Sequence, residues 1–258
     1  MAYFDYNGKK VFYREIGEGK PCMFLHGNTA SSRMFEPVLP LYTTGRKVIL
    51  IDFAGNGRSE RLLAFPDELW IDQGHQIVEL CRKLNCAKVD LVGTSGGAYA
   101  AVNAALECPG LFDRVVADSF TGNRLPEDFA EAILEEREAA KKDKGSREFY
   151  EWNQGEDWER VVDLDTEVLV NYERKHTRIF HRPIEQIQVP LLITISREDE
   201  MLAKDMDAEC SYLCNSNPLI HCRIYDTGAH PLIYFRAEEI ADQIKDFFCV
   251  CFDESHTG

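Results

Sequence analysis

Residues 89–106 have the sequence VDLVGTSGGAYAAVNAAL. The apolar run Val89–Val92 is typical of a buried strand, and the Ala-rich run Ala98–Leu106 favours a helix. Between them, Gly93–Gly97 forms a Gly-x-Ser-x-Gly motif, whose small residues permit a strained turn that exposes a serine hydroxyl at the end of a strand. Ser95 is therefore the candidate nucleophile. The alternative is a glycine-rich turn without a catalytic role.

Further apolar runs indicate that this strand belongs to a sheet. Each is short and bounded by Gly, Asp, Pro or Ser: Cys22–Leu25, Val48–Ile51, Val115–Ala117 and Leu191–Ile195. Strands this apolar are typical of a parallel sheet covered on both faces. Apolar residues recur at helical spacing between them, as in Trp70–Leu84 and Ile240–Phe248, which predicts an α/β fold. Near the N-terminus, Asn7-Gly8 separates two extended runs and predicts a β-hairpin.

Residues 121–188 differ in composition from the rest of the chain. Of these 68 residues, 28 are charged, a share well above the 28% of the whole chain, and Asp128–Lys144 is rich in the helix-favouring Ala, Glu and Lys. We interpret the segment as a helical cap, or lid, inserted into a core domain formed by residues 1–120 and 189–258. The alternative is an ordinary solvated helical hairpin with no role at a site.

Charge and composition exclude several classes of function. The net charge of −15 repels phosphate backbones and anionic membrane surfaces, so we expect neither a nucleic-acid nor a membrane partner. The longest uncharged stretch, Leu91–Leu106, is too short to span a bilayer, and Met1–Lys10 lacks the apolar core of a secretory signal. The nine cysteines are odd in number and contain no Cys-x-x-Cys pair, which argues against a zinc site or a disulfide framework. We therefore expect a cytoplasmic protein with reduced thiols and no metal.

A serine nucleophile needs a histidine base, because its hydroxyl is a weak nucleophile at neutral pH. His230 is the strongest candidate among the seven histidines. It follows the strand-like run Leu219–Tyr225, precedes the last predicted helix, and lies in a loop of small residues that leaves room for an imidazole.

The base in turn needs a carboxylate that holds its tautomer. Asp199 lies just past the run Leu191–Ile195, so that Ser, Asp and His follow one another in the chain. Its neighbours Glu198 and Glu200 compete with it, and Asp118 is an alternative acid because it also follows a predicted strand.

Acyl transfer further needs hydrogen-bond donors for the developing oxyanion. The backbone amide of Gly96, directly after the candidate nucleophile, is one candidate. The other is the amide of Asn28 in the loop His26-Gly27-Asn28-Thr29, where a glycine allows close approach of the backbone. The alternative is that this loop only ends a strand.

Together these motifs resemble the α/β-hydrolase superfamily over nearly the whole chain. The resemblance rests on His26–Asn28, Asp52–Ser59, Gly93–Gly97, Asp199 and Gly228–His230. It implies a mostly parallel sheet of about eight strands with a hairpin start and a helical cap inserted after the sixth strand. It also implies a triad and an oxyanion hole: Ser95, Asp199 and His230, with the amides of Asn28 and Gly96. We expect only a structural role for Asp52–Ser59.

The chain differs from one branch of that superfamily in its candidate nucleophile. The run His26-Gly27-Asn28 followed by Ser31-Ser32 is similar to haloalkane dehalogenases, which use an aspartate nucleophile. This chain has Ser95 instead. An alkylated serine would be an ether without a carbonyl for water to attack, so dehalogenation is disfavoured.

The expected function is that of a serine hydrolase, most simply a carboxylesterase acting on small to medium acyl esters without a cofactor. The same triad suits a lactonase, an amidase or aminopeptidase, or a carbon–carbon bond hydrolase. A different class, a hydrolase-fold protein that binds a small molecule without turnover, is the alternative. Because neutral His230 is the base, activity should fall below an apparent pKa of roughly 6–7. In the cap, Trp152 and Trp158, with Phe149 and Tyr150, are candidates to face the substrate pocket.

Overall fold

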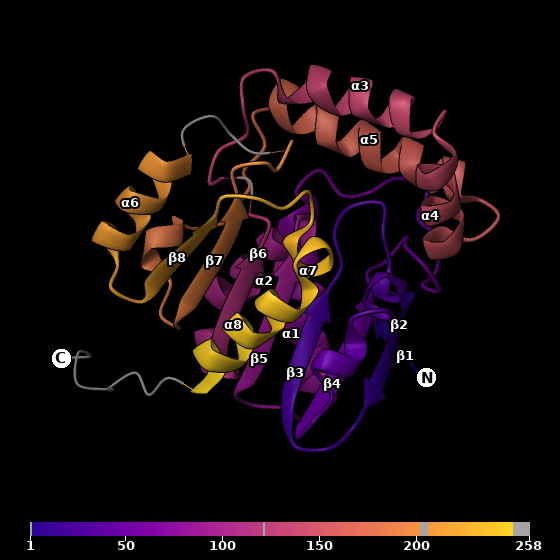
Figure 1. Ribbon diagram of the computed structural model, residues 1–258. Coiled ribbons are helices and arrows are strands. Elements are labelled where there is room, and N and C mark those ends of the chain that lie inside the picture. The colour runs from indigo at the N-terminus through magenta and orange to yellow at the C-terminus, as the bar shows by residue number, and fades with distance from the viewer. Residues whose placement is uncertain (1, 121, 202–205, 250–258) are drawn as a thin grey trace.

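Eight strands form one central sheet in the computed structural model, which describes residues 2–120, 122–201 and 206–249 (Figure 1). The strands are β1 (Ala2–Tyr6), β2 (Lys9–Ile16), β3 (Lys20–Leu25), β4 (Arg46–Asp52), β5 (Val89–Thr94), β6 (Phe112–Asp118), β7 (Leu191–Ser196) and β8 (Ile220–Tyr225). Their order in the sheet is β1-β2-β4-β3-β5-β6-β7-β8, and β2 is antiparallel to both of its neighbours while the other pairs are parallel. The predicted mostly parallel α/β sheet is confirmed.

The predicted hairpin joins β1 to β2. Asn7 and Gly8 have φ angles of 52° and 76°, the left-handed conformation that a two-residue hairpin turn requires at both positions. Tyr6 pairs with Lys9 across this turn.

Helices cover both faces of the sheet and one of its ends. They are α1 (Leu69–Lys83), α2 (Gly96–Glu107), α3 (Phe129–Ala140), α4 (Lys144–Gln154), α5 (Trp158–Arg174), α6 (Met206–Ser216), α7 (Leu232–Phe235) and α8 (Ala237–Cys249). Successive side chains of β3 alternate between the faces: Met23 and Leu25 pack with α1 and α2, whereas Cys22 and Phe24 pack with α8. This two-sided burial explains why the strand segments are continuously apolar.

Helices α3, α4 and α5 are inserted between β6 and β7 and lie above one end of the sheet (Figure 1). The expectation of one helix over Asp128–Lys144 is wrong at its C-terminal end, because α3 ends at Ala140 and α4 begins at Lys144. Asp143 separates them: its carboxylate accepts a hydrogen bond from the Ser146 amide at 2.8 Å and caps α4.

The insertion is attached to the core through α4 and α5. Apolar residues of α5, among them Val161 and Val168, belong to the same cluster as the sheet. At the end of α4, Gln154 donates to the Ala30 carbonyl and accepts from the Gly57 amide, both at 2.7 Å.

In the parts of the chain that the structure describes, no helix is both long and apolar enough to cross a membrane.

Candidate active site

Ser95 occupies a strained turn between β5 and α2. Its backbone has φ 54° and ψ −126°, a conformation that is costly for any residue with a Cβ atom. The Ser95 amide donates to the Asp118 carbonyl at 2.9 Å, which anchors the turn to β6. The loop after β3 approaches closely, because a Cβ atom on Gly27 would lie 3.0 Å from Ser95 Cβ. The predicted strand, turn and helix are thus present, with the loop of residues 26–29 beside the serine.

His230 and Asp199 form a hydrogen-bonded pair. Nδ1 of His230 lies 2.8 Å from Oδ2 of Asp199, whose side chain is buried, and the other Asp199 oxygen accepts from the Met201 amide at 2.9 Å. Burial by itself lowers the pKa of His230, but the hydrogen bond and the charge of Asp199 outweigh it, so the pKa is raised above its usual 6.5. With Nδ1 facing the carboxylate, Nε2 is the nitrogen available to act as a base.

Asp118, the alternative acid, hydrogen-bonds to three scaffold groups. It is completely buried, and its oxygens accept hydrogen bonds from Thr94 Oγ1 at 2.7 Å, Thr194 Oγ1 at 2.8 Å and the Ile233 amide at 3.2 Å. Burial raises the pKa of Asp118, and these three hydrogen bonds oppose the rise. The structure therefore joins β5, β7 and α7 through Asp118 and does not hydrogen-bond it to His230.

The same carboxylate brings the serine and histidine segments together. Thr94 directly precedes Ser95, Ile233 lies three residues after His230, and both donate to Oδ2 of Asp118. Within residues 2–120, 122–201 and 206–249, no hydrogen bond joins Ser95 Oγ to His230. Such catalytic contacts commonly tighten only when substrate is bound.

Two backbone amides beside Ser95 are available as donors. Gly96 is the first residue of α2, where the N–H groups lack helical acceptors and the helix dipole favours negative charge. The Asn28 amide likewise has no acceptor among the residues that the structure describes. The two positions adjoin, because a Cβ atom on Gly96 would overlap Oδ1 of Asn28.

The Asn28 side chain has two partners that the motif analysis did not identify. Its Oδ1 accepts from Nε1 of Trp70 at 3.0 Å, and its Nδ2 donates to Oδ2 of Asp165 at 2.6 Å. Asp165 is 2% exposed and lies on the apolar face of α5, between Val161 and Val168. A carboxylate in that helical position is the sequence signal that points to a buried partner.

Burial raises the pKa of Asp165, while the nearby Arg137 and the hydrogen bond from Asn28 oppose the rise. Nη2 of Arg137 lies 3.5 Å from Oδ1 of Asp165. The carboxylate is therefore held between a cation of α3 and the loop after β3.

The two predicted pocket tryptophans contact other aromatic rings of the insertion. Trp158 stacks on Tyr150 at a centroid distance of 5.6 Å, beside the small apolar cluster of the insertion. Trp152 contacts the Phe149 ring at 6.4 Å, and its carbonyl accepts from Arg33. Neither tryptophan is among the residues that line the pocket described below, and their role in a substrate pocket stays a prediction.

A different set of aromatic side chains adjoins the nucleophile turn. Trp70 stacks on Tyr99, one helical turn after Ser95, with ring centroids 4.5 Å apart. Tyr99 also contacts Phe120 at 5.1 Å and Phe180 at 5.7 Å. These rings form a wall between the turn and the chain segment that leaves the insertion.

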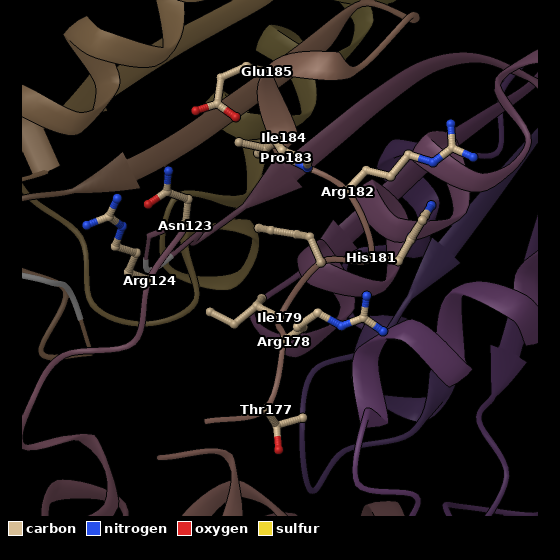
Figure 2. Close-up of a pocket in the computed structure, with 11 residues that line it drawn as sticks. Asn123, Arg124, Thr177, Arg178, Ile179, His181, Arg182, Pro183, Ile184 and Glu185 are labelled. Carbon is tan, nitrogen blue, oxygen red and sulfur yellow. The ribbon is translucent and has the colours of Figure 1, made fainter. Parts of the chain in front are cut away.

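A pocket of about 480 Å³ lies beyond this wall, where the two connections of the insertion meet the core. Figure 2 shows Asn123 and Arg124, from the first connection, on one side and Ile179 and Ile184, from the second, facing them. Phe180 also lines the pocket and belongs to the aromatic wall. Phe180 thus joins the pocket lining to Tyr99 of α2, the helix that begins after Ser95.

Other motif residues have structural roles. Asp52 accepts hydrogen bonds from the amides of Ser32 at 2.9 Å and Arg58 at 2.8 Å, and Nε2 of His26 accepts from the Phe53 amide at 3.0 Å. Burial lowers the pKa of His26. Across the described ranges, no three His, Cys, Asp or Glu side chains are grouped as metal ligands, and the eight cysteines found there are free thiols. Cys251 lies outside the described residues.

Comparisons with known proteins concern the family and the fold. Residues 22–243 match the alpha/beta hydrolase family. The chain is 36% identical over 110 residues to 2-(acetamidomethylene)succinate hydrolase of Mesorhizobium japonicum, which is 42% of this chain and 38% of that protein. It is 27% identical over 135 residues to (E)-2-((N-methylformamido)methylene)succinate hydrolase of Acinetobacter baylyi, which is 52% of this chain and 50% of that protein. The matched part thus spans half or less of the length of these relatives.

Among solved structures, the fold resembles MGS-M2, an alpha/beta hydrolase enzyme from a Medee basin deep-sea metagenome library. The TM-score is 0.75 at 18% identity, over 99% of this chain and 100% of that chain. At this level of identity the likeness concerns the fold.

Proposed function

The chain belongs to the alpha/beta hydrolase family, and from this premise we propose that it is a serine hydrolase, a carboxylesterase that cleaves small to medium acyl esters. The observation that carries the proposal is the 2.8 Å contact between His230 and Asp199 at the sheet edge where Ser95 occupies its strained turn. A serine, an oriented imidazole and a buried carboxylate are the groups that acyl transfer needs.

In the acylation step, Ser95 Oγ attacks the ester carbonyl while Nε2 of His230 takes the serine proton. The carbonyl oxygen gains negative charge and accepts hydrogen bonds from the amides of Asn28 and Gly96. Asp199 holds the imidazole through Nδ1 and stabilises its positive charge. His230 then returns the proton to the departing alkoxide, which leaves as an alcohol.

In the deacylation step, water attacks the acyl-serine carbonyl and gives a proton to His230. The second tetrahedral intermediate collapses, the Ser95–acyl bond breaks, and the proton on the imidazole returns to Ser95 Oγ. The products are the free acid and the regenerated serine.

We further propose that residues 121–188 act as a cap on a core formed by residues 1–120 and 189–258. The position of α3, α4 and α5 over one end of the sheet supports this division (Figure 1). The pocket between the connections of the insertion supports a role of the cap in substrate selection.

A second candidate is hydrolysis of an amide that carries carboxylates. The names of the two relatives describe hydrolases of substituted succinates, which are dicarboxylates. Arg124 and Arg182 line the pocket, together with Arg178, which pairs with Glu68 at 2.8 Å, and with the carboxylate of Glu185 (Figure 2). Guanidinium groups bind carboxylates well, so Arg124 and Arg182 support this candidate. Parallel assays with neutral esters and with amide-bearing succinates distinguish the two activities.

The proposal is tested by labelling the purified protein with a fluorophosphonate probe and locating the label by peptide mass spectrometry. We expect the label on Ser95 and none in a Ser95→Ala variant, together with turnover of p-nitrophenyl acetate or butyrate that the variant lacks. A folded wild-type protein that neither reacts nor turns over any ester or amide would favour the non-catalytic binding role. Label on a different residue would mean that Ser95 is not the nucleophile.

A further inference from the structure

Asp165 lies on the inserted helix α5, yet its carboxylate contacts the loop that carries Asn28. Nδ2 of Asn28 donates to Oδ2 of Asp165 at 2.6 Å across a separation of 137 positions in the chain. The backbone amide of Thr29 also acts to lower the pKa of this carboxyl. Asp165 therefore holds a core loop from the insertion, through its hydrogen bond with Asn28.

Stability alone does not account for an aspartate at this position. Asp165 is 2% exposed, on a helix face that is otherwise apolar, and its Oδ1 has no hydrogen-bond partner among the described residues. Burying a carboxylate is costly, and the 3.5 Å contact with Arg137 compensates only in part. Apolar residues in place of both Asp165 and Arg137 would continue the apolar face at a lower cost. The carboxylate is therefore better explained by its hydrogen bond with the Asn28 side chain.

The loop that Asp165 binds is strained. Thr29 has a φ of 57°, a left-handed conformation that is a genuine outlier for a β-branched residue. Such strain persists only where the surroundings impose it. Asp165 holds the residue directly before Thr29, through its hydrogen bond with the Asn28 side chain.

The other side of Asn28 is held from the core. Nε1 of Trp70 donates to Oδ1 of Asn28 at 3.0 Å, and that oxygen occupies the space that a Cβ atom of Gly96 would need. The Asn28 side chain is thus clamped between α1 and α5, directly over the first residue of α2. Any change at Asp165 is transmitted to residue 28 and to its contact with the nucleophile turn.

We propose that Asp165 is a positioning residue, which orients the Asn28 loop so that the amides of Asn28 and Gly96 converge on the oxyanion. This inference rests on the proposed function. On this proposal the insertion contributes to transition-state stabilisation. The Asn28 amide of the core loop is aligned only while α5 contacts that loop. Since oxyanion donors act mainly in the transition state, loss of Asp165 affects kcat rather than KM.

The test compares Asp165→Asn and Asp165→Ala with the wild type on p-nitrophenyl butyrate. Asparagine keeps one acceptor oxygen in nearly the same volume, whereas alanine removes both. We expect kcat to fall about tenfold or more in Asp165→Ala and less in Asp165→Asn, with KM changed by less than about threefold. Asp163→Asn, an exposed aspartate of the same helix paired with Lys141, is the matched control and keeps the wild-type kcat.

A second readout does not depend on turnover. The indole N–H signal of Trp70, assigned in ¹⁵N-tryptophan spectra with a Trp70→Phe variant, reports on its bond to Asn28. Both Asp165 variants should shift this signal, and Asp163→Asn should not. Far-UV circular dichroism checks that each variant is folded. If the alanine variant does not fold, the near-isosteric Asp165→Asn carries the kinetic and spectral comparison.

If the wild type is active and both folded Asp165 variants have the same kcat as the wild type, the positioning role is overturned and the proposed function is left intact. A loss confined to KM, or an unshifted Trp70 signal, would overturn the positioning role as well. A wild-type protein without turnover or fluorophosphonate label would overturn the proposed function, and the positioning role with it.

Discussion

Nδ1 of His230 lies 2.8 Å from Oδ2 of Asp199, although the two residues are 31 positions apart and lie on loops after different strands. The contact orients the ring and raises the pKa of the imidazole against the opposing effect of burial. Asp118, which is also buried near this edge of the sheet, hydrogen-bonds to the scaffold instead. The two carboxylates should therefore respond differently to substitution.

Replacing Asp199 with asparagine should lower kcat by about three to four powers of ten, because the imidazole is then held in the wrong tautomer. The measurement is steady-state ester hydrolysis by purified protein. Glu198→Gln is the control and should retain activity, since among the described residues the Glu198 side chain hydrogen-bonds only with the Gly228 amide. An equal loss in that control would contradict the assignment.

Replacing Asp118 with alanine should destabilise the fold by at least about 3 kcal/mol, because three donors lose a buried acceptor. Urea unfolding followed by tryptophan fluorescence measures the change. Asp242→Ala removes an exposed carboxylate paired with Lys245 and should cost about 1 kcal/mol or less. Equal stability of the two variants would show that Asp118 does not hold β5, β7 and α7 together.

Activity should rise with pH through an apparent pKa above 6.5, because neutral His230 is the base and Asp199 raises the pKa of its imidazole. As the pH falls through that value the base is protonated and the rate is lost. In Asp199→Asn the same limb should move to lower pH. A wild-type profile whose acidic limb lies below pH 6.5 is the result that does not fit.

The contribution of the His230–Asp199 pair to the free energy of unfolding should fall as pH rises, whereas activity should rise. Because the folded-state pKa of His230 is raised, the contribution is fully present below the unfolded value near 6.5 and is lost as pH rises through the folded value. The difference in unfolding free energy between wild type and His230→Gln should therefore shrink above neutral pH. Urea unfolding on both sides of that range measures it, and a difference that grows with pH would contradict the pairing.

Replacing Gly96 with alanine should lower kcat at least about a hundredfold, because the added methyl group overlaps Oδ1 of Asn28 and displaces a candidate oxyanion donor. Gly110→Ala is the matched control, since a Cβ atom there meets nothing within 4 Å. Both variants are assayed for ester hydrolysis and for folding by circular dichroism. Full activity of a folded Gly96→Ala would exclude a donor role for this turn.

Local patterns predicted most elements of the sheet. The run Val89–Val92 with its glycine-rich turn and Ala-rich helix needs only neighbouring residues to specify strand, turn and helix. Asn7-Gly8 similarly predicts its hairpin through backbone conformation alone. The helix expected over Asp128–Lys144 was interrupted because an aspartate in a helix-rich stretch also caps a new helix, and propensity does not distinguish the two.

The contacts of the candidate site depended on how distant segments meet. Chain order allowed both Asp118 and Asp199 as the acid, and only the placement of the loops after β6, β7 and β8 brings one of them to His230. Aromatic composition likewise did not separate Trp158, which stacks on Tyr150 of the insertion, from Trp70, which contacts Asn28.

The sequence alone predicts the α/β sheet, the turn that carries Ser95 and a short set of candidate triad partners for that serine. These depend on periodicity and on local backbone conformation. The acid that pairs with His230 and the clamp of Asn28 between Trp70 and Asp165 were decided by the tertiary structure. A hydrogen bond requires two groups at about 3 Å with the right direction, and no local pattern specifies that distance between residues far apart in the chain.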